Sequence, residues 1–129
     1  MIYLASPYHD PDPAVRAERL RLAEEAMHFF FQGTSVFSPI AHNGPSSERL
    51  GSHHPADYLL FDFEMLDNAD HLAVLDIPNW RQSRGVLMEI GFAIHAGHRL
   101  SLVREDPEHG GWTLIDLTPE EMVTLIYKE

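Results

Sequence analysis

Cysteine is absent from the 129 residues of this chain. The chain therefore has no disulfide, no thiolate nucleophile and no cysteine-based zinc site, a composition that suits the reducing cytoplasm. Basic residues are scarce, with nine Lys and Arg against twenty Asp and Glu, and the net charge is −11. Because such a charge repels polyanions, we expect no nucleic acid polymer as a partner. A small anionic ligand is still compatible with this charge where a few arginines gather.

Long apolar runs are also missing. The apolar stretches are far shorter than a membrane span, and the first of them is not preceded by the basic segment of a signal peptide. We therefore expect a cytoplasmic protein without a membrane partner. Apolar residues nevertheless form 44% of the chain, which is normal for a globular protein, and residues 1–129 are long enough for one domain with a single core.

Segments typical of strands and helices alternate along the chain. Apolar strands are predicted at residues 1–5, 35–37, 71–76 and 99–103, followed by an extended segment at 112–116. Amphipathic helices are predicted at 14–32, 56–68 and 84–96, and the capping signals of residues 118–121 begin another. This alternation predicts an α/β domain whose mostly parallel sheet has four to five strands with helices on both faces.

Residues 39–55 interrupt this pattern with a composition rich in His, Asn, Gly, Ser and Pro. We interpret them as a long loop that closes over a ligand, since structureless loops of this length are usually functional. His42, His53 and His54 lie in this segment and Asp57 follows it. Two adjacent histidines cannot easily bind one ion, and the histidine spacing of helical zinc sites is missing. We therefore expect no metal.

Ligands of parallel α/β sheets bind outside the carboxyl ends of the strands. This rule brings together three segments that follow predicted strands, at residues 6–8, 39–42 and 79–85. The sequence has neither the G-x-G-x-x-G pattern of dinucleotide-binding proteins nor the pattern of a P-loop. We therefore expect a small-molecule site at this edge of the sheet, with no cofactor.

Ser83 precedes the predicted helix 84–96, and a serine beside the free backbone N–H groups of a helix start can bind an anion. Arg81 and Arg84 flank this serine, and guanidinium groups suit phosphate. Six residues further on, Glu89 is a single carboxylate in an otherwise apolar helix. The pattern indicates a phosphate-bearing substrate beside a nucleophile; the alternative is a helix cap followed by a solvated glutamate.

Three segments, in this order and spacing, resemble the nucleoside 2-deoxyribosyltransferase superfamily over roughly residues 1–103. They are Tyr3-Leu4-Ala5-Ser6-Pro7-Tyr8, Asp62-Phe63-Glu64-Met65-Leu66-Asp67-Asn68-Ala69-Asp70 and the segment from Ser83 to Gly91. The resemblance implies a Rossmann-like (flavodoxin-like) fold and cleavage of the N-glycosidic bond of a nucleoside or nucleotide. It also implies a glutamate nucleophile at Glu89, an aspartate near the base and sugar at Asp62, and a first-strand tyrosine at Tyr3.

Ser83 distinguishes two branches of this superfamily. Transferases that act on free nucleosides typically carry an aspartate six residues before the glutamate, whereas the branch of 2′-deoxynucleoside 5′-phosphate N-hydrolases has a serine there. An aspartate repels a phosphate, and a serine at a helix N-terminus donates to it. We therefore predict hydrolysis of a nucleoside 5′-monophosphate, with 2′-deoxyribose as the expected sugar. A base-exchanging transferase, a non-catalytic nucleotide sensor and a protein that binds partners through its acidic surface are the alternatives.

The predicted chemistry needs few side chains. Glu89 stabilises the oxocarbenium character at C1′ and can trap it covalently. Asp62 or a nearby water supplies a proton to the departing base, unless Asp62 lies on a solvated helix face. Tyr3 either orients Glu89 by donating its hydroxyl or packs in the core, and Tyr8 and Trp80 either stack on a base or anchor loops. We predict further substrate contacts from Ser6, Pro7, Tyr8, His42, Trp80, Arg81, Ser83, Arg84 and Gly85.

The resemblance also implies a homodimer or a larger homo-oligomer. One small sheet does not need all the apolar residues that the helices carry, and we expect some of them to be exposed. We predict a dimer interface mainly through the helix 56–68, with the segment from Gly110 to Thr113 as a candidate for entering the partner's pocket. The apolar residues expected at the surface are Phe29, Phe31, Leu59, Leu60 and Phe61.

Overall fold

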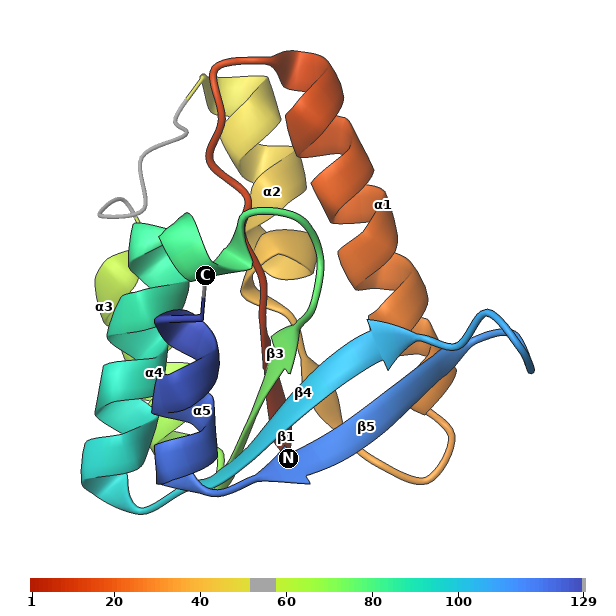
Figure 1. Ribbon diagram of the computed structural model, residues 1–129. Coiled ribbons are helices and arrows are strands. Elements are labelled where there is room, and N and C mark those ends of the chain that lie inside the picture. The colour runs from red at the N-terminus through yellow and green to blue at the C-terminus, as the bar shows by residue number, and fades with distance from the viewer. Residues whose placement is uncertain (52–57, 129) are drawn as a thin grey trace.

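The computed structural model describes residues 1–51 and 58–128. Figure 1 shows a central sheet with helices packed on either side. The elements in chain order are β1 (Ile2–Ala5), α1 (Pro13–Phe30), β2 (Val36–Phe37), α2 (Pro39–Leu50), α3 (Leu59–Asn68), β3 (His71–Leu75), the 3₁₀ turn η2 (Trp80–Gln82), α4 (Arg84–Ala96), β4 (Arg99–Glu105), β5 (Trp112–Leu117) and α5 (Pro119–Ile126). No helix in these described parts is long and apolar enough to cross a bilayer.

The sheet has five strands in the order β2-β1-β3-β4-β5. β1 is parallel to both β2 and β3, β3 is parallel to β4, and only β5 runs antiparallel. The predicted α/β class with a mostly parallel sheet is therefore confirmed. After β1 the chain goes to one side to form β2 and later returns to the other side to form β3. The carboxyl ends of β1 and β3 are thus the switch point at which ligands of such sheets bind.

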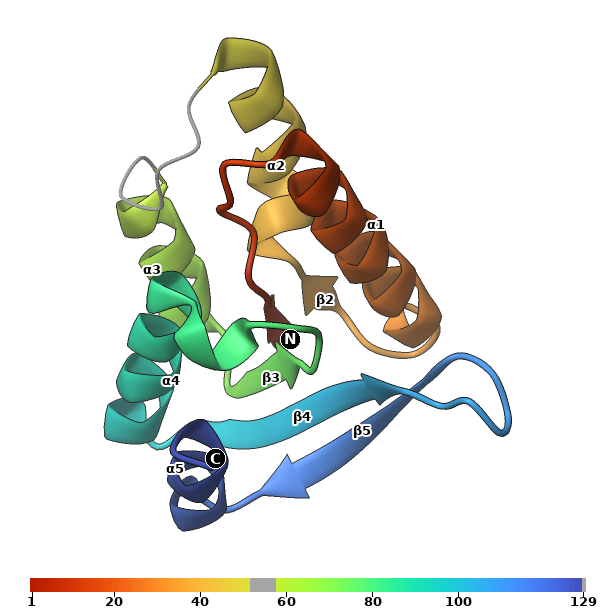
Figure 2. The same cartoon turned by 45° about the horizontal axis from the view of Figure 1, so that its top comes forward.

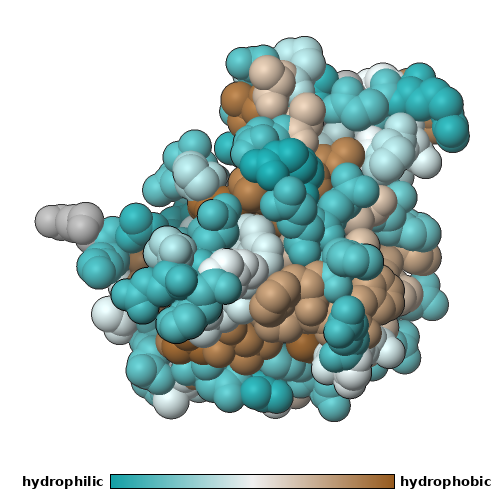
Figure 3. All heavy atoms as spheres, turned by 90° about the vertical axis from the view of Figure 1, so that its right-hand side faces the viewer, coloured by the Kyte–Doolittle hydropathy of each residue, from teal (hydrophilic) through white to brown (hydrophobic). Residues whose placement is uncertain are grey.

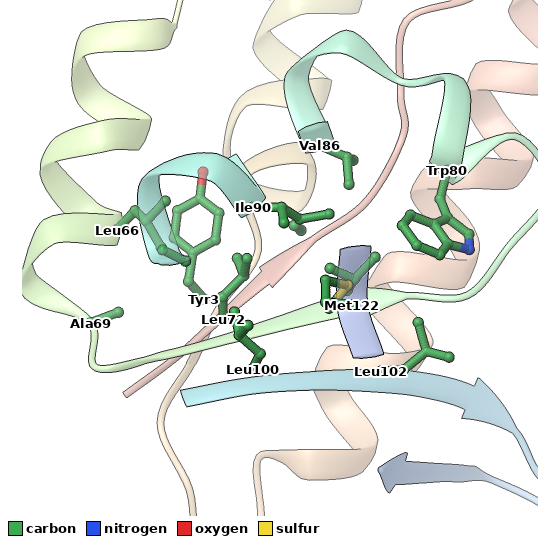
Figure 4. Packing of buried hydrophobic residues seen from close by; sticks show 13 residues of the cluster. Tyr3, Leu66, Ala69, Leu72, Trp80, Val86, Ile90, Leu100, Leu102 and Met122 are labelled. Atoms are coloured by element: carbon green, nitrogen blue, oxygen red, sulfur yellow. The ribbon is translucent and has the colours of Figure 1, made fainter. Parts of the chain in front are cut away.

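Two apolar layers hold the helices to the sheet. On one face, β1, β3 and β4 pack against α3, α4 and α5, with Tyr3, Leu66 and Ile90 among the buried residues. Figure 4 shows the Tyr3 ring inside this layer, with its hydroxyl turned away from the strands. The other face packs mainly against α1, through Leu22 and Ala26. Burial of each such leucine contributes about 2 kcal/mol, so the layers fix where the strand ends and helix starts meet.

Helix α2 corrects the prediction of a loop at residues 39–55. Ser38 caps the helix by accepting the Ala41 N–H at 3.2 Å, and Gly51 ends it with a positive φ of 74°. The composition is poor for a helix and includes Pro45 in its interior. Packing supplies the stability that propensity does not. Gly44 is buried, and a Cβ there would lie 3.5 Å from Leu20 of α1.

The remaining differences from the predicted elements are small. Helix α1 ends at Phe30 instead of residue 32, and β4 extends to Glu105. The described part of the predicted helix 56–68 begins at Leu59, because residues 52–57 lie outside the described residues. The two helix starts that matter most for the site, α2 and α4, both follow a serine cap.

Candidate functional site

A cavity of about 720 Å³ lies at the carboxyl ends of β1 and β3. Its walls are the segment 6–10 after β1, Arg19 of α1, parts of α2 and α3, the turn η2 and the first turns of α4. Figures 1 and 2 show α1 and α2 on one side of the segment 6–10 and α3 and α4 on the other. The cavity therefore occupies the switch point, and its volume suits a ligand of nucleotide size.

Glu89 reaches this cavity from α4 and is held by Tyr3 from β1. The Tyr3 side chain is completely buried, and its hydroxyl donates a hydrogen bond to Oε2 of Glu89. The pKa of Glu89 is raised to about 8, mainly by burial. The hydrogen bond from Tyr3 lowers this pKa, and the charge of Asp62 raises it further. Burial and the two carboxylates raise the pKa of Tyr3 as well, so its hydroxyl keeps its proton and acts as a donor.

Asp62 is the second carboxylate in the cavity wall and comes from α3. Its Oδ1 accepts a hydrogen bond from Nδ2 of Asn43 at 2.9 Å, which joins α3 to α2. Burial raises the pKa of Asp62 to about 6. The hydrogen bond from Asn43 and the charge of His42 both act in the opposite direction and lower this pKa. The cavity thus holds two interacting carboxyl groups that titrate at different pH, a property often found in acid–base pairs.

The start of α4 contributes the predicted anion-binding groups. Ser83, Arg84 and Gly85 all line the cavity. The Ser83 side chain accepts the Val86 N–H at 3.3 Å and caps the helix. A hydroxyl that accepts one bond still has its own proton to donate. The first turn of α4 therefore offers a hydroxyl and a guanidinium group next to the N-terminal end of a helix.

Two residues predicted to contact the ligand, Trp80 and Arg81, do not line this cavity. Trp80 is buried in the core and its indole N–H donates to Asp76 at 3.0 Å, so it anchors η2 and does not line the cavity. Arg81 donates from Nη1 to the carbonyl oxygens of Lys128 at 2.7 Å and Leu125 at 3.3 Å. The tight turn of η2 directs these two side chains toward β4 and α5 instead of the cavity.

The other predicted contacts divide between the cavity and its rim. Ser6, Pro7 and Tyr8 line the cavity, although the Tyr8 hydroxyl already donates to Glu48 at 2.6 Å. His42 does not line it: the exposed imidazole stacks on Phe61 with ring centroids 5.1 Å apart. The predicted ligand contact of His42 is therefore not supported, and its influence on the site passes through the pKa of Asp62.

Metal-ligand groups are not assembled in the described parts of the chain. Within residues 1–51 and 58–128, no three His, Asp or Glu side chains lie close enough to hold an ion. His53, His54 and Asp57 lie outside the described residues.

Two polar residues of the cavity escape the sequence-based prediction. Asn43 was assigned to a loop, and its place on α2 brings it to Asp62. Arg19 lies in the predicted helix 14–32 without a predicted role, yet it is buried and lines the cavity. In the sequence, Arg21 has glutamates three and four positions away, at Glu18 and Glu25, whereas Arg19 has none at these spacings; this difference is the one signal that could have drawn attention to it.

Fold and site together define an α/β domain with a two-carboxylate cavity at the switch point of its sheet. The chain matches the model of a family described as a domain of unknown function, DUF1937, over residues 1–105, and it belongs to that family. This match includes every residue of the cavity wall and ends at Glu105, the last residue of β4. No curated protein matches the sequence.

Proposed function

We propose that this protein hydrolyses the N-glycosidic bond of a 2′-deoxynucleoside 5′-monophosphate. The observation that carries the proposal is the Glu89 carboxyl group, which lines a nucleotide-sized cavity and accepts a hydrogen bond from the Tyr3 hydroxyl. Asp62 in the same wall is a second carboxyl group within electrostatic range. Glycoside cleavage commonly uses two such groups, one for C1′ and one for the departing group. The resemblance to the nucleoside 2-deoxyribosyltransferase superfamily agrees with this assignment.

The proposed reaction proceeds in two steps. The Glu89 carboxylate attacks C1′ as the bond between C1′ and the base nitrogen breaks, and the base leaves with a proton from Asp62 or from water. Water then hydrolyses the ester between Glu89 and C1′, which gives the sugar 5-phosphate and restores the carboxylate. Tyr3 fixes the direction of the carboxylate and favours its ionised form, because its hydroxyl donates to Oε2.

The two pKa values restrict how this mechanism works. With pKa values of about 8 for Glu89 and about 6 for Asp62, the empty site holds its proton mainly on Glu89 at neutral pH. The reactive form has the proton on Asp62 and is therefore the minor form of the empty site. Positive charge that develops at C1′ in the transition state stabilises the ionised Glu89 and lowers the barrier for the reaction of this form. An optimum between about pH 6 and 8 follows.

The decisive experiment is incubation with a panel of ribo- and deoxynucleoside 5′-monophosphates, with chromatography to detect free base. We expect base and sugar phosphate in equal amounts from at least one deoxynucleotide, and none with Glu89→Gln. Addition of a second base tests for transfer, which would yield a new nucleotide. Binding of nucleotides without release of base would favour a sensor, and no release from any member of the panel would contradict the proposal.

A further inference from the structure

Arg19 is a buried cation in the wall of the cavity. It lies on α1 and is 8% exposed, and its only hydrogen bonds within the described residues run from Nη1 to the carbonyl oxygens of Tyr8 at 3.4 Å and His9 at 3.0 Å. Its Nε and Nη2 groups make no hydrogen bond to the described parts of the chain. A guanidinium group has five N–H donors, so most of its donors are left for a ligand.

Arg19 has no carboxylate partner among residues 1–51 and 58–128. Among the described residues, no Asp or Glu lies within ion-pair distance of it; Asp10, which lines the same cavity, accepts the Asp12 N–H at 2.9 Å. Arg16, one turn earlier and equally buried, instead forms a pair with Glu48 at 2.6 Å. Because a buried charge is normally paired, the difference between the two arginines needs an explanation.

Ser6 provides a second and independent observation in the same cavity. It is 8% exposed, and its Oγ is a buried polar atom without a hydrogen-bond partner in the described parts of the chain. A buried hydroxyl without a partner costs about 1–3 kcal/mol. Ser6 and Arg19 both belong to the cavity wall, and Arg19 contacts the segment that Ser6 begins. Two unsatisfied donors at one wall indicate a ligand that carries acceptors.

Charge is distributed unevenly around the cavity. Glu89 and Asp62 approach from α4 and α3, whereas Arg19 approaches from α1 on the other side of the segment 6–10. An anionic group is repelled by the two carboxylates and attracted to the guanidinium group. We propose that Arg19 and Ser6 form an anion subsite that takes the phosphate group of the ligand. Figures 1 and 2 also place the segment 6–10 beside η2 and the start of α4, so Ser83 completes the donors around this phosphate.

The identification of the anion as a nucleotide 5′-phosphate rests on the proposed function, but the subsite itself does not. Its test therefore uses inorganic phosphate and measures binding alone, by calorimetric titration at fixed ionic strength with chloride as the comparison anion. We expect Arg19→Gln to weaken phosphate binding about ten- to a hundredfold, since a charge-assisted hydrogen bond is lost. Ser6→Ala should weaken it several-fold and, by removing an unpaired hydroxyl, raise the melting temperature by a few degrees.

Arg16→Gln is the matched control, because it removes an equally buried arginine from the same helix. It should lower the melting temperature and leave phosphate affinity within twofold of the original. Far-UV circular dichroism checks the folding of each variant, and if Arg19→Gln does not fold, Arg19→Lys and Ser6→Ala carry the test. The subsite would be overturned if Arg19→Gln, or both Arg19→Lys and Ser6→Ala, bound phosphate as tightly as the original protein. It would also be overturned if Arg16→Gln lost as much phosphate affinity as Arg19→Gln, or if the original protein did not prefer phosphate to chloride.

Glu89→Gln separates this inference from the proposed function. That variant should bind phosphate as well as the original protein or better, because a carboxylate is removed, while it releases no base from nucleotides. A protein that binds phosphate through Arg19 but cleaves no nucleotide refutes the glycosidase and leaves the subsite intact. A protein that cleaves nucleotides but binds phosphate equally well after Arg19→Gln refutes the subsite alone.

Discussion

The Tyr3 hydroxyl on β1 donates a hydrogen bond to the Glu89 carboxylate on α4, across 86 positions of sequence. Both residues are fixed by the same apolar layer, because Tyr3 is a core residue and Glu89 is followed by the core residue Ile90. The carboxylate therefore has a defined direction at the cavity wall. Burial and the charge of Asp62 raise the pKa of this carboxyl group, and the hydrogen bond from Tyr3 lowers it; substitution of Tyr3 or of Asp62 alters one influence at a time.

Tyr3→Phe tests the donated hydrogen bond. Because this bond lowers the pKa of Glu89, we expect its loss to raise that pKa above about 8 and to move the alkaline limb of the pH–rate profile upward. If Glu89 is the nucleophile, its ionised fraction and the rate at pH 7 should fall together, by about tenfold per pKa unit. The control is Tyr127→Phe at an exposed tyrosine of the C-terminal end. An unchanged rate at pH 7 with a shifted limb would instead make Glu89 an acid.

Glu89→Gln tests the nucleophile directly. We expect at least about a 10³-fold loss of base release, since the amide cannot form the ester to C1′. Nucleotide binding, measured by calorimetry, should persist. Glu64→Gln provides the control, because Glu64 is an exposed residue of α3 outside the cavity wall and its loss should leave the rate unchanged. Near-normal activity of Glu89→Gln would end the glycosidase proposal.

The same variant should change the pH dependence of stability. A carboxyl group whose pKa rises on folding to about 8 binds more protons in the native state than in the unfolded state between its ordinary pKa of 4.5 and about 8. Its contribution to the free energy of unfolding therefore decreases as pH rises across this range. We expect Glu89→Gln to match the original protein near pH 4.5 and to be more stable at pH 8, by on the order of a few kcal/mol. Urea unfolding at both pH values measures the difference; equal stability at pH 8 would contradict it.

Asp62→Asn distinguishes the roles of the two carboxyl groups. Removal of its charge lowers the pKa of Glu89, because Asp62 raises it in the original protein. With Glu89 as nucleophile, the residual activity should rise with pH and level off below about pH 8, without a decline at higher pH. A residual activity that instead decreases through this range would assign the proton donor to Glu89. Initial rates from pH 5 to 9 with one deoxynucleotide give the answer.

Local sequence signals predicted most of the secondary structure and missed α2. The Ser83 cap and the Gly97 end marked α4 correctly, because capping depends on neighbouring residues. Ser38 and Gly51 give α2 the same signals, but its interior composition favours a loop. The contacts that stabilise α2 are long-range, such as the pair between Glu48 and Arg16, and no local pattern contains them.

In the site, too, the features set by local sequence could be predicted and those set by long-range packing could not. The rule about carboxyl strand ends brought Ser6 and Ser83 to one edge of the sheet, where both line one cavity together with Glu89. The directions of the η2 side chains depend on the distant helix α5, so the role of Arg81 could not be read from its position. Arg19 reaches the cavity only because α1 packs across the sheet, which sequence periodicity alone does not specify.

Ser83→Asp tests the anion-binding start of α4. Aspartate caps helices as well as serine does, so we expect the fold and its melting temperature to be retained. A negative charge next to a phosphate costs several kcal/mol, so the affinity for nucleoside 5′-monophosphates should fall on the order of a hundredfold. The affinity for the matching nucleosides should stay the same. Ser83→Asn, an uncharged cap, serves as the control, and equal losses for nucleotide and nucleoside would contradict a phosphate at this helix.

Exposed apolar residues lie on several elements, among them the end of α1, with Phe29 and Phe31, and α3, with Leu60 and Phe61; of these two elements, α3 contributes more residues to the cavity wall. Figure 3 shows apolar atoms on the face that carries the end of α1 and the β4–β5 hairpin, where Phe29 and Phe31 are exposed. The entry of the segment 110–113 into a partner stays a prediction; Trp112 of this segment is buried and Gly111 lies against Phe29 of its own chain, whereas Gly110, Gly111 and Thr113 are exposed. Leu59, expected at the surface, is half-buried and lines the cavity.

A homodimer through α3 is the prediction that links assembly to activity. Leu60 is 88% exposed and Phe61 41%, on the helix that carries Asp62 into the cavity wall, so a partner at α3 would shield the carboxylates from solvent. We expect Leu60→Glu to give a monomer in light scattering and to lower the rate of base release at least about tenfold, since a charge at the centre of an interface opposes association. Phe31→Glu places the same charge on the other apolar surface and should leave both properties unchanged. If Phe31→Glu dissociated the dimer instead, the interface would lie at the end of α1. If the original protein were a fully active monomer at assay concentration, the prediction would be contradicted, and one chain would form the complete cavity.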